Sequence, residues 1–334
     1  MKRSIILLLI SMWFAFAKAD NGVIYYLNNI KIGEPVHYKN LQIFPILAKI
    51  PLDIQDYVTL DAAMAKGWLK IREAGSGEVN FVEVKNNGGK MVFMMTGEIV
   101  SGAKQDRMLK EDVLLPAKSA WIRVPVYCVE HGRWTSNTNE FKSEGLLAPN
   151  AVRERAKATE SQSEVWDEIA KSQEKLGIAA ATGTVRANYE DEDIQKELGE
   201  YKDRFRKIPE LSPSTIGVVV VSGYRVICVD IFANNDLLSE LWDKLLKSYC
   251  MDAIAGEQGL MDKEDIEALI QSLKDAKYVS TGTPGLGNLF AIESELGKGG
   301  ALVYKSSVLH LDFFPDSANQ DEPGIPLDFR RDQR

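Results

Sequence analysis

The 334-residue sequence has few of the residues that most often bind metals or form cross-links: three cysteines and three histidines. The histidines are His37, His131 and His310, and no H-x-x-x-H, H-E-x-x-H or C-x-x-C pattern occurs. Because zinc and thiol redox sites need such spacings, we expect neither of them, and no cofactor. The G-x-S-x-G turn of many serine hydrolases is also absent.

The cysteines, Cys128, Cys228 and Cys250, all lie within apolar stretches. A buried free thiol behaves as a small apolar residue, so we expect each to be a core residue. A disulfide between Cys228 and Cys250 is the alternative. Because the number is odd, at least one thiol stays unpaired in either case.

The sequence lacks an apolar run long enough to cross a bilayer. The N-terminal run, Ile5 to Ala17, has 13 residues, whereas a spanning helix needs about 20. It follows Lys2 and Arg3 and leads into a small-x-small pattern at residues 17–19, which predicts a cleavable signal peptide over residues 1–19. We therefore expect an exported protein, periplasmic or extracellular. An uncleaved anchor or a buried first helix is the alternative.

Basic residues are outnumbered by acidic ones, 40 to 48, which gives a formal net charge of -8. Loss of Lys2, Arg3 and Lys18 with the signal peptide would take this charge to -11. Such a charge argues against nucleic acid and against anionic membranes as general partners. It does not indicate the oligomeric state.

The N-terminal half is rich in β-branched and aromatic residues separated by turn signals, which predicts strands. The predicted strands are Val23–Tyr26, Leu41–Ile46, Asn80–Val84, Lys90–Met95 and Trp121–Val129. Thr59–Trp68 instead predicts a short helix. Residues 151–207 are rich in charged residues and alanine, which favours an exposed helical segment, with Asp191–Arg206 its clearest helix. A partly disordered linker is the alternative.

After residue 212 the pattern predicts a hairpin, two amphipathic helices and closing strands. These are Gly217–Val221 with Arg225–Ile231, the helices around residues 237–249 and 266–273, and the strands Leu289–Ile292, Ala301–Tyr304 and Val308–Phe314. Strands and grouped helices without regular alternation predict an α+β fold: a β-rich N-terminal half, a helical insertion and a C-terminal α/β portion in one body. We expect one domain over residues 20–314 and a loose polar tail over 315–334.

A glycine-bracketed turn follows the predicted strand at Lys90–Met95. Residues 97–107 read G-E-I-V-S-G-A-K-Q-D-R. Glycine lets backbone amides approach a ligand, and lysine or arginine beside it can hold a carboxylate or phosphate. The candidate ligand-binding residues are Glu98, Lys104, Gln105 and Arg107. A solvated loop with a structural ion pair is the alternative.

A second polar segment, residues 128–134, reads C-V-E-H-G-R-W at the end of an alternating strand. Binding residues are often placed at strand ends, so Glu130, His131, Arg133 and Trp134 are further candidates. A nucleophile pair of Cys128 and His131 is disfavoured, because the cysteine should face the core while the histidine lies beyond the strand. A polar turn anchored by Trp134 is the alternative.

A third candidate is the closing strand, where alternation places His310 and Asp312 on the same face. A carboxylate there could orient the histidine. We favour the simpler interpretation, in which these residues form the solvent-exposed face of the strand.

Taken together, G-E-x-x-x-G-A-K-Q-x-R and C-V-E-H-G-R-W resemble a bacterial and archaeal family. It is named for its association with ADP-ribosylglycohydrolases and rhodanese-type phosphatases. The resemblance covers about residues 32–314 and is strongest over 92–134. It implies a shared site for both motifs and hints at the metabolism of ADP-ribose or related phosphorylated nucleotides. The predicted signal peptide weakens the nucleotide interpretation, because free nucleotides are scarce outside the cytoplasm.

Three functions stay open. The first is the binding of a small anionic ligand at a site lined by Glu, Lys, Arg and Trp. The second is a hydrolase or transferase for an ADP-ribose-like or other phosphorylated compound, with Glu98 or Glu130 as general base. The third is a non-catalytic periplasmic interaction protein, in which the motifs are buried and salt-bridged to each other.

Overall fold

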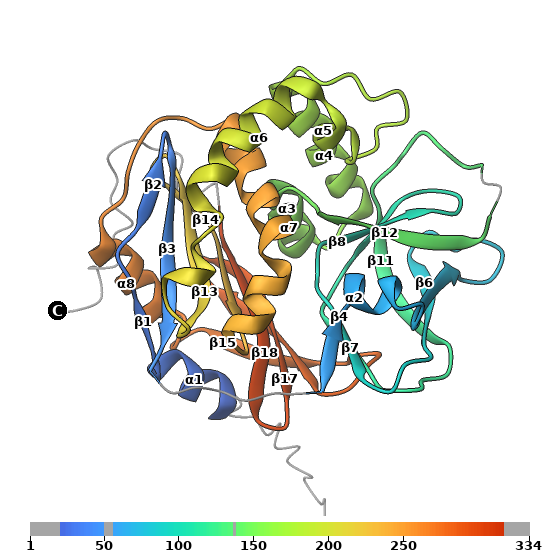
Figure 1. The fold of residues 1–334 in the computed structure, drawn as a ribbon, viewed down its shortest axis with the longest axis horizontal. Helices are drawn as coiled ribbons and strands as arrows, with labels where there is room; N and C mark the ends of the chain where they lie inside the picture. The colour runs from blue at the N-terminus through green and yellow to red at the C-terminus, as the bar shows by residue number, and fades with distance from the viewer. Residues whose placement is uncertain (1–20, 50–55, 136–137, 317–334) are drawn as a thin grey trace, which may run out of the picture.

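The computed structural model describes residues 21–49, 56–135 and 138–316, and the statements below refer to these. The predicted signal peptide and residues 317–334 of the predicted tail lie outside them. Figure 1 shows a closed barrel on one side, a large sheet on the other, and helices between the two. The predicted α+β fold in one body is confirmed. No helix in these ranges is long and apolar enough to span a membrane.

The N-terminal half folds into a six-stranded barrel, in the order β11-β6-β5-β12-β8-β9. Its strands are β5 (Leu69–Glu73), β6 (Phe81–Asn86), β8 (Glu98–Gly102), β9 (Arg107–Leu109), β11 (Ile122–Cys128) and β12 (Glu140–Leu147). Beside it lie the helix α2 (Leu60–Ala65) and a small sheet of β4 (Tyr57–Thr59), β7 (Met91–Met94) and β10 (Val113–Leu115). The loops after β5, β8 and β11 all leave the same end of the barrel, because neighbouring strands are antiparallel.

The large sheet joins the start of the chain to its end. Its strands are β1 (Ile30–Ile32), β2 (Val36–Tyr38), β3 (Leu41–Ala48), β13 (Thr215–Ser222), β14 (Arg225–Phe232), β15 (Lys277–Thr281), β16 (Asn288–Ser294), β17 (Gly297–Tyr304) and β18 (Ser307–Pro315). The predicted β13–β14 hairpin is confirmed. Apolar clusters cover both faces, which explains why β13 is one continuous apolar run.

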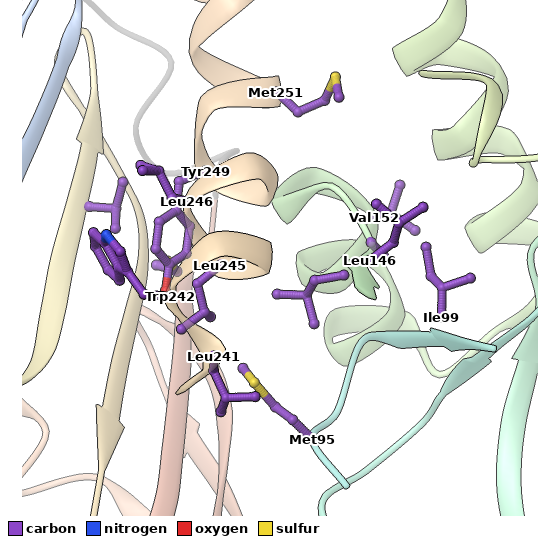
Figure 2. Packing of buried hydrophobic residues seen from close by; sticks show 14 of the residues in the cluster. Met95, Ile99, Leu146, Val152, Leu241, Trp242, Leu245, Leu246, Tyr249 and Met251 are labelled. Carbon is purple, nitrogen blue, oxygen red and sulfur yellow. The ribbon is translucent and has the colours of Figure 1, made fainter. Parts of the chain in front are cut away.

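Helices cover the two faces of this sheet. The outer face carries α1 (Asn21–Asn28) and α8 (Lys263–Ser272), and the inner face carries α3 (Asn150–Thr159) and α7 (Asn235–Ile254). Figure 2 shows the inner packing, in which Leu241 of α7 approaches Met95 beside the barrel. The helix α7 therefore packs on the barrel and on the sheet at once.

The predicted helical segment over residues 151–207 is confirmed. It contains α3, α4 (Gln162–Leu176), α5 (Ala187–Glu190) and α6 (Glu192–Phe205), and a short 3-10 turn, Pro209–Leu211, follows. Its few apolar residues recur at helical spacing, so α6 buries Leu198, Tyr201 and Phe205 on one side. Asp191 begins α6 by accepting hydrogen bonds from two backbone N–H groups.

Of two predictions that concern buried residues, one is wrong and one is confirmed. The predicted strand Val23–Tyr26 is wrong, because these residues lie in α1. Val23, Tyr26 and Leu27 recur at helical spacing and are buried, and a window of four residues was too short to reveal that period. The three cysteines are free and buried as predicted, and the alternative disulfide does not form.

Two glycines are expected to respond in opposite ways to alanine. At Gly217 in β13 a Cβ atom would lie 2.8 Å from the Cα of Ile231, so Gly217→Ala should cost about 1–3 kcal/mol of unfolding free energy. Gly199, exposed within α6, has no atom within 4 Å of that position, so Gly199→Ala should stabilise by about 0.5–1 kcal/mol. Urea unfolding of both variants measures this, and equal effects would contradict the packing described here.

Candidate functional site

The two sequence motifs contact each other at one end of the barrel. β9 pairs with β11, so that Arg107 lies opposite Cys128 and the loops beyond them meet. Gln105 Nε2 donates to the Glu130 carbonyl (2.9 Å), and Asp106 N donates to Glu130 Oε2 (3.1 Å). The structure therefore brings both motifs into one hydrogen-bonded framework.

Arg133 ties this framework together. Its guanidinium donates to Glu130 Oε2 (2.6 Å), to Asp106 Oδ1 (3.3 Å) and to the Ala103 carbonyl (2.7 Å). Thr182, from the loop after α4, adds a hydrogen bond to Glu130 Oε1 (2.9 Å). Burial acts to raise the pKa of Glu130, but the bond from Arg133 and the other donors outweigh it and lower that pKa. Glu130 and Arg133 therefore use their hydrogen bonds on each other and on neighbouring protein groups.

Arg107 is bonded differently. It is fully buried, and strand alternation places it on the same face of β9 as Leu109, in the barrel interior. Its Nη1 donates to the Gln105 carbonyl (3.3 Å) and to Gln105 Oε1 (3.2 Å). Its Nε and Nη2 have no hydrogen-bond partner, and Glu73 Oε2 lies 3.9 Å from Nη2 without accepting a bond.

The outer side of the same loops carries the half-buried Lys104 and the exposed Trp134 and His131. Lys104 Nζ donates to the Ser76 carbonyl (2.6 Å) and lies 4.9 Å from the ring centre of Trp134, which is 49% exposed. His131 is exposed and packs edge-to-face on Trp166 at 4.4 Å.

Cys128 does not engage His131. Its thiol donates to the Glu130 carbonyl (3.4 Å), and burial raises its pKa. The cysteine thus faces the interior while the histidine has its own partner on the surface, as the sequence indicated.

Glu98 is held by other partners. It accepts from Met95 N (2.7 Å) and from Lys244 Nζ of α7 (2.6 Å), and Lys244 also pairs with Asp61. Burial raises the pKa of Glu98 against the opposing charge of Lys244. Among the described residues, its side chain bonds none of the other seven candidates. The sequence could have indicated that Lys244 is buried, because it follows Leu241 by three residues on the buried face of α7.

A second polar cluster lies between the barrel and the large sheet. His310 Nδ1 is 2.7 Å from Asp112 Oδ2, and His310 Nε2 is 3.4 Å from Asp230 Oδ1. Arg153 of α3 binds both oxygens of Asp230 (2.8 and 3.1 Å), and the ring of Phe232 stacks on His310 at 4.6 Å. One ionic chain thus joins the loop before β10, the sheet and α3.

This cluster corrects the interpretation of β18 as a strand with a solvent-exposed face. His310 and Asp312 share a face as expected, but they are 0% and 1% exposed because α3 and the barrel loop cover them. The carboxylates that orient His310 are Asp112 and Asp230, which lie far from it in sequence. Across the described ranges, no group of three or more His, Cys, Asp or Glu side chains is arranged to hold a metal ion.

Comparison with known proteins gives one match. The family model described as ARG and Rhodanese-Phosphatase-superfamily-associated Protein domain, ARPP-1, matches residues 29–314. No curated protein and no solved structure matches the chain.

His310 should make the stability of the protein depend on pH. Burial alone would lower its pKa, but Asp112 and Asp230 outweigh burial and raise the pKa from 6.5 to about 9. A raised folded-state pKa gives a contribution that is complete below pH 6.5 and is lost as the pH rises through 9, on the order of 3 kcal/mol.

The test compares the wild type with His310→Gln by urea unfolding between pH 7.5 and 9.5. Cys128 and Cys250 contact neither His310 nor its two aspartates, so the difference between the two curves reports His310 and the groups it pairs with, Cys228 among them through Asp230. With only three histidines in the chain, an NMR titration of the wild type reports the same group directly. Parallel stability curves, or an imidazole that titrates near 6.5, would show that the two aspartates do not hold a buried imidazolium.

Proposed function

We propose that this chain, which belongs to the ARPP-1 family of ARG and Rhodanese-Phosphatase-superfamily-associated Protein domains, binds a small anionic ligand where the two motif loops meet. The observation that carries the proposal is the buried guanidinium of Arg107 with its unused Nε and Nη2 donors. A buried donor without an acceptor costs about 1–3 kcal/mol, and more when it is charged. Such a cost is offset when a bound group accepts those hydrogen bonds.

The two unused nitrogens favour an oxyanion as that group. Nε–H and Nη2–H lie side by side on one edge of a guanidinium, which matches two oxygens of a carboxylate or phosphate. Glu73 balances the charge of Arg107, but Lys104 N holds its Oε1 at 3.0 Å and its Oε2 stays 3.9 Å away. The pairing edge of Arg107 therefore has no hydrogen-bond acceptor in the described part of the protein.

Neighbouring residues divide into framework and ligand-facing groups. Gln105, Glu130 and Arg133 spend their hydrogen bonds on the protein, so we assign them the task of holding the two loops in register. Lys104 and Trp134 lie on the outer side of the same loops, where the half-buried lysine stands over the exposed ring. They suit a ligand that carries its anionic group on a larger, partly planar body.

Catalysis at this framework has less support. A hydrolase or transferase needs a general base, and the lowered pKa of Glu130, with donors on both of its oxygens, makes it a weak one. Glu98 belongs to the Lys244 cluster instead. We therefore propose binding as the function, and export, indicated by residues 1–19, as its setting.

The test is a binding screen with inorganic phosphate, AMP, ADP-ribose and a set of dicarboxylates, read by calorimetry and thermal unfolding. A true ligand at 100 times its Kd should stabilise the protein by about 2.7 kcal/mol. Arg107→Lys keeps the charge but loses the paired donors, so it should weaken binding about 10- to 100-fold, as expected for charged hydrogen bonds.

The matched control is Arg123→Lys, an arginine of the same barrel that pairs with Glu78 on the outer surface. It should bind like the wild type. Trp134→Ala is a second probe, because an exposed side chain can be removed without disturbing the fold. A ligand that binds equally well to folded Arg107→Lys, or no binding by any compound of the screen, would refute the proposal.

A further inference from the structure

Two ion pairs lie side by side beneath α3. Arg153 and Lys157 are one helical turn apart, and they reach Asp230 of β14 and Asp312 of β18. The two aspartates are themselves neighbours across the β14–β18 ladder. Lys157 Nζ lies 3.2 Å from Asp312 Oδ1, and its side chain is 21% exposed, whereas that of Asp312 is 1% exposed.

The two aspartates differ in how their charge is stabilised. Asp230 accepts hydrogen bonds from Arg153 and Tyr249 and faces His310. Asp312 accepts none: both of its oxygens are buried without a hydrogen-bond partner, the only carboxylate of the described ranges of which this is true. Lys157 is within contact distance but does not approach in the direction of a hydrogen bond.

We propose that Lys157 and Asp312 condense to an intramolecular amide that links α3 covalently to β18. A proton first passes from the Lys157 ammonium to the Asp312 carboxylate; the neutral amine then attacks the carboxyl carbon, a C–N bond forms and a C–O bond breaks. One proton stays on nitrogen, and the other two protons of the ammonium leave with the oxygen as water. The ion pair and the amide have the same net charge, so no oxidant, reductant or other reactant is needed.

Energetics and access both favour this step. A buried ammonium–carboxylate pair carries a desolvation cost that its attraction only partly offsets, and a neutral amide removes both charges. Lys157 reaches Asp312 across Gly300 of β17, where a Cβ atom would lie 2.9 Å from its Nζ. A side chain at residue 300 would hold the amine away from the carboxyl group.

We assign the role of proton carrier to Glu111, whose charge interacts with that of Lys157. Burial raises its pKa to about 7, and the charge of Lys157 is the strongest opposing influence. At neutral pH its carboxyl group is therefore protonated about half of the time. It can give a proton to the departing oxygen of Asp312 and recover one from the Lys157 nitrogen, so that it ends unchanged.

The chain contains an internal comparison. Lys244 and Glu98 are closer, at 2.6 Å, but Lys244 is shared with Asp61 and Glu98 also accepts from Met95 N. These bonds stabilise the ionised forms, so the proton transfer that must precede attack by the amine is less favourable than in the Lys157–Asp312 pair. We expect this second pair to stay unlinked.

The test is the intact mass of the folded wild-type chain after several days at neutral pH, measured in denaturant. The expected mass is one water below that of the unlinked chain with the same N-terminus. Digestion should give one branched peptide that contains Lys157 and Asp312. Lys157→Arg should restore the full mass, and Asp312→Asn should lose ammonia in place of water.

A folded wild-type chain of full mass, with the Lys157 and Asp312 peptides separate, overturns the proposal without any variant. If the link forms, Glu111→Gln should slow it by at least 10-fold while circular dichroism stays native. A link that forms in Glu111→Gln at the wild-type rate would remove Glu111 from the reaction. A link between Lys244 and Glu98 would contradict the argument from hydrogen bonding.

Discussion

Charges buried between the barrel and the large sheet must be paired, and this constraint sets how the two halves meet. Asp112 comes from the barrel side, His310 and Asp230 from the sheet, and Arg153 from α3. A buried pair adds little net stability, but removal of one partner costs about 3–5 kcal/mol because the other charge is left alone. The network therefore determines how the barrel and the sheet are arranged but adds little to the stability of that arrangement. The favourable contacts between the two halves come from the apolar faces of α7.

The need to pair buried charges also distinguishes residues within the motif loops. Glu130 and Arg133 satisfy each other and the surrounding backbone, so their chemistry is used in holding the loops. Arg107, five residues before Asp112 on the strand that leads to the buried network, keeps an unused edge. All three side chains are charged and buried or half-buried. Only Arg107 keeps donors without an acceptor, which sets it apart from the framework residues.

The sequence predicted what depends on local pattern. The β13–β14 hairpin followed from its apolar runs and turn, and the proximity of the motifs followed from their resemblance to one family. It could not predict partners that lie far apart, such as Lys244 for Glu98 or Asp112 for His310, because pairing across the fold leaves no periodic signal. Closure of the barrel was missed for the same reason, because it depends on which strands pair, and β9, which closes it, has only three residues.

The proposed ligand site depends most on the unused edge of Arg107, and NMR of its side-chain Nε–H group observes that edge directly. In the free protein, a fully buried Nε–H should exchange slowly with solvent and give a separate signal. A compound from the phosphate and carboxylate series should shift this signal through a new hydrogen bond, while the Arg133 signals stay in place. If the Arg107 signal is unmoved by every compound that binds, or Arg133 alone responds, the ligand site lies elsewhere.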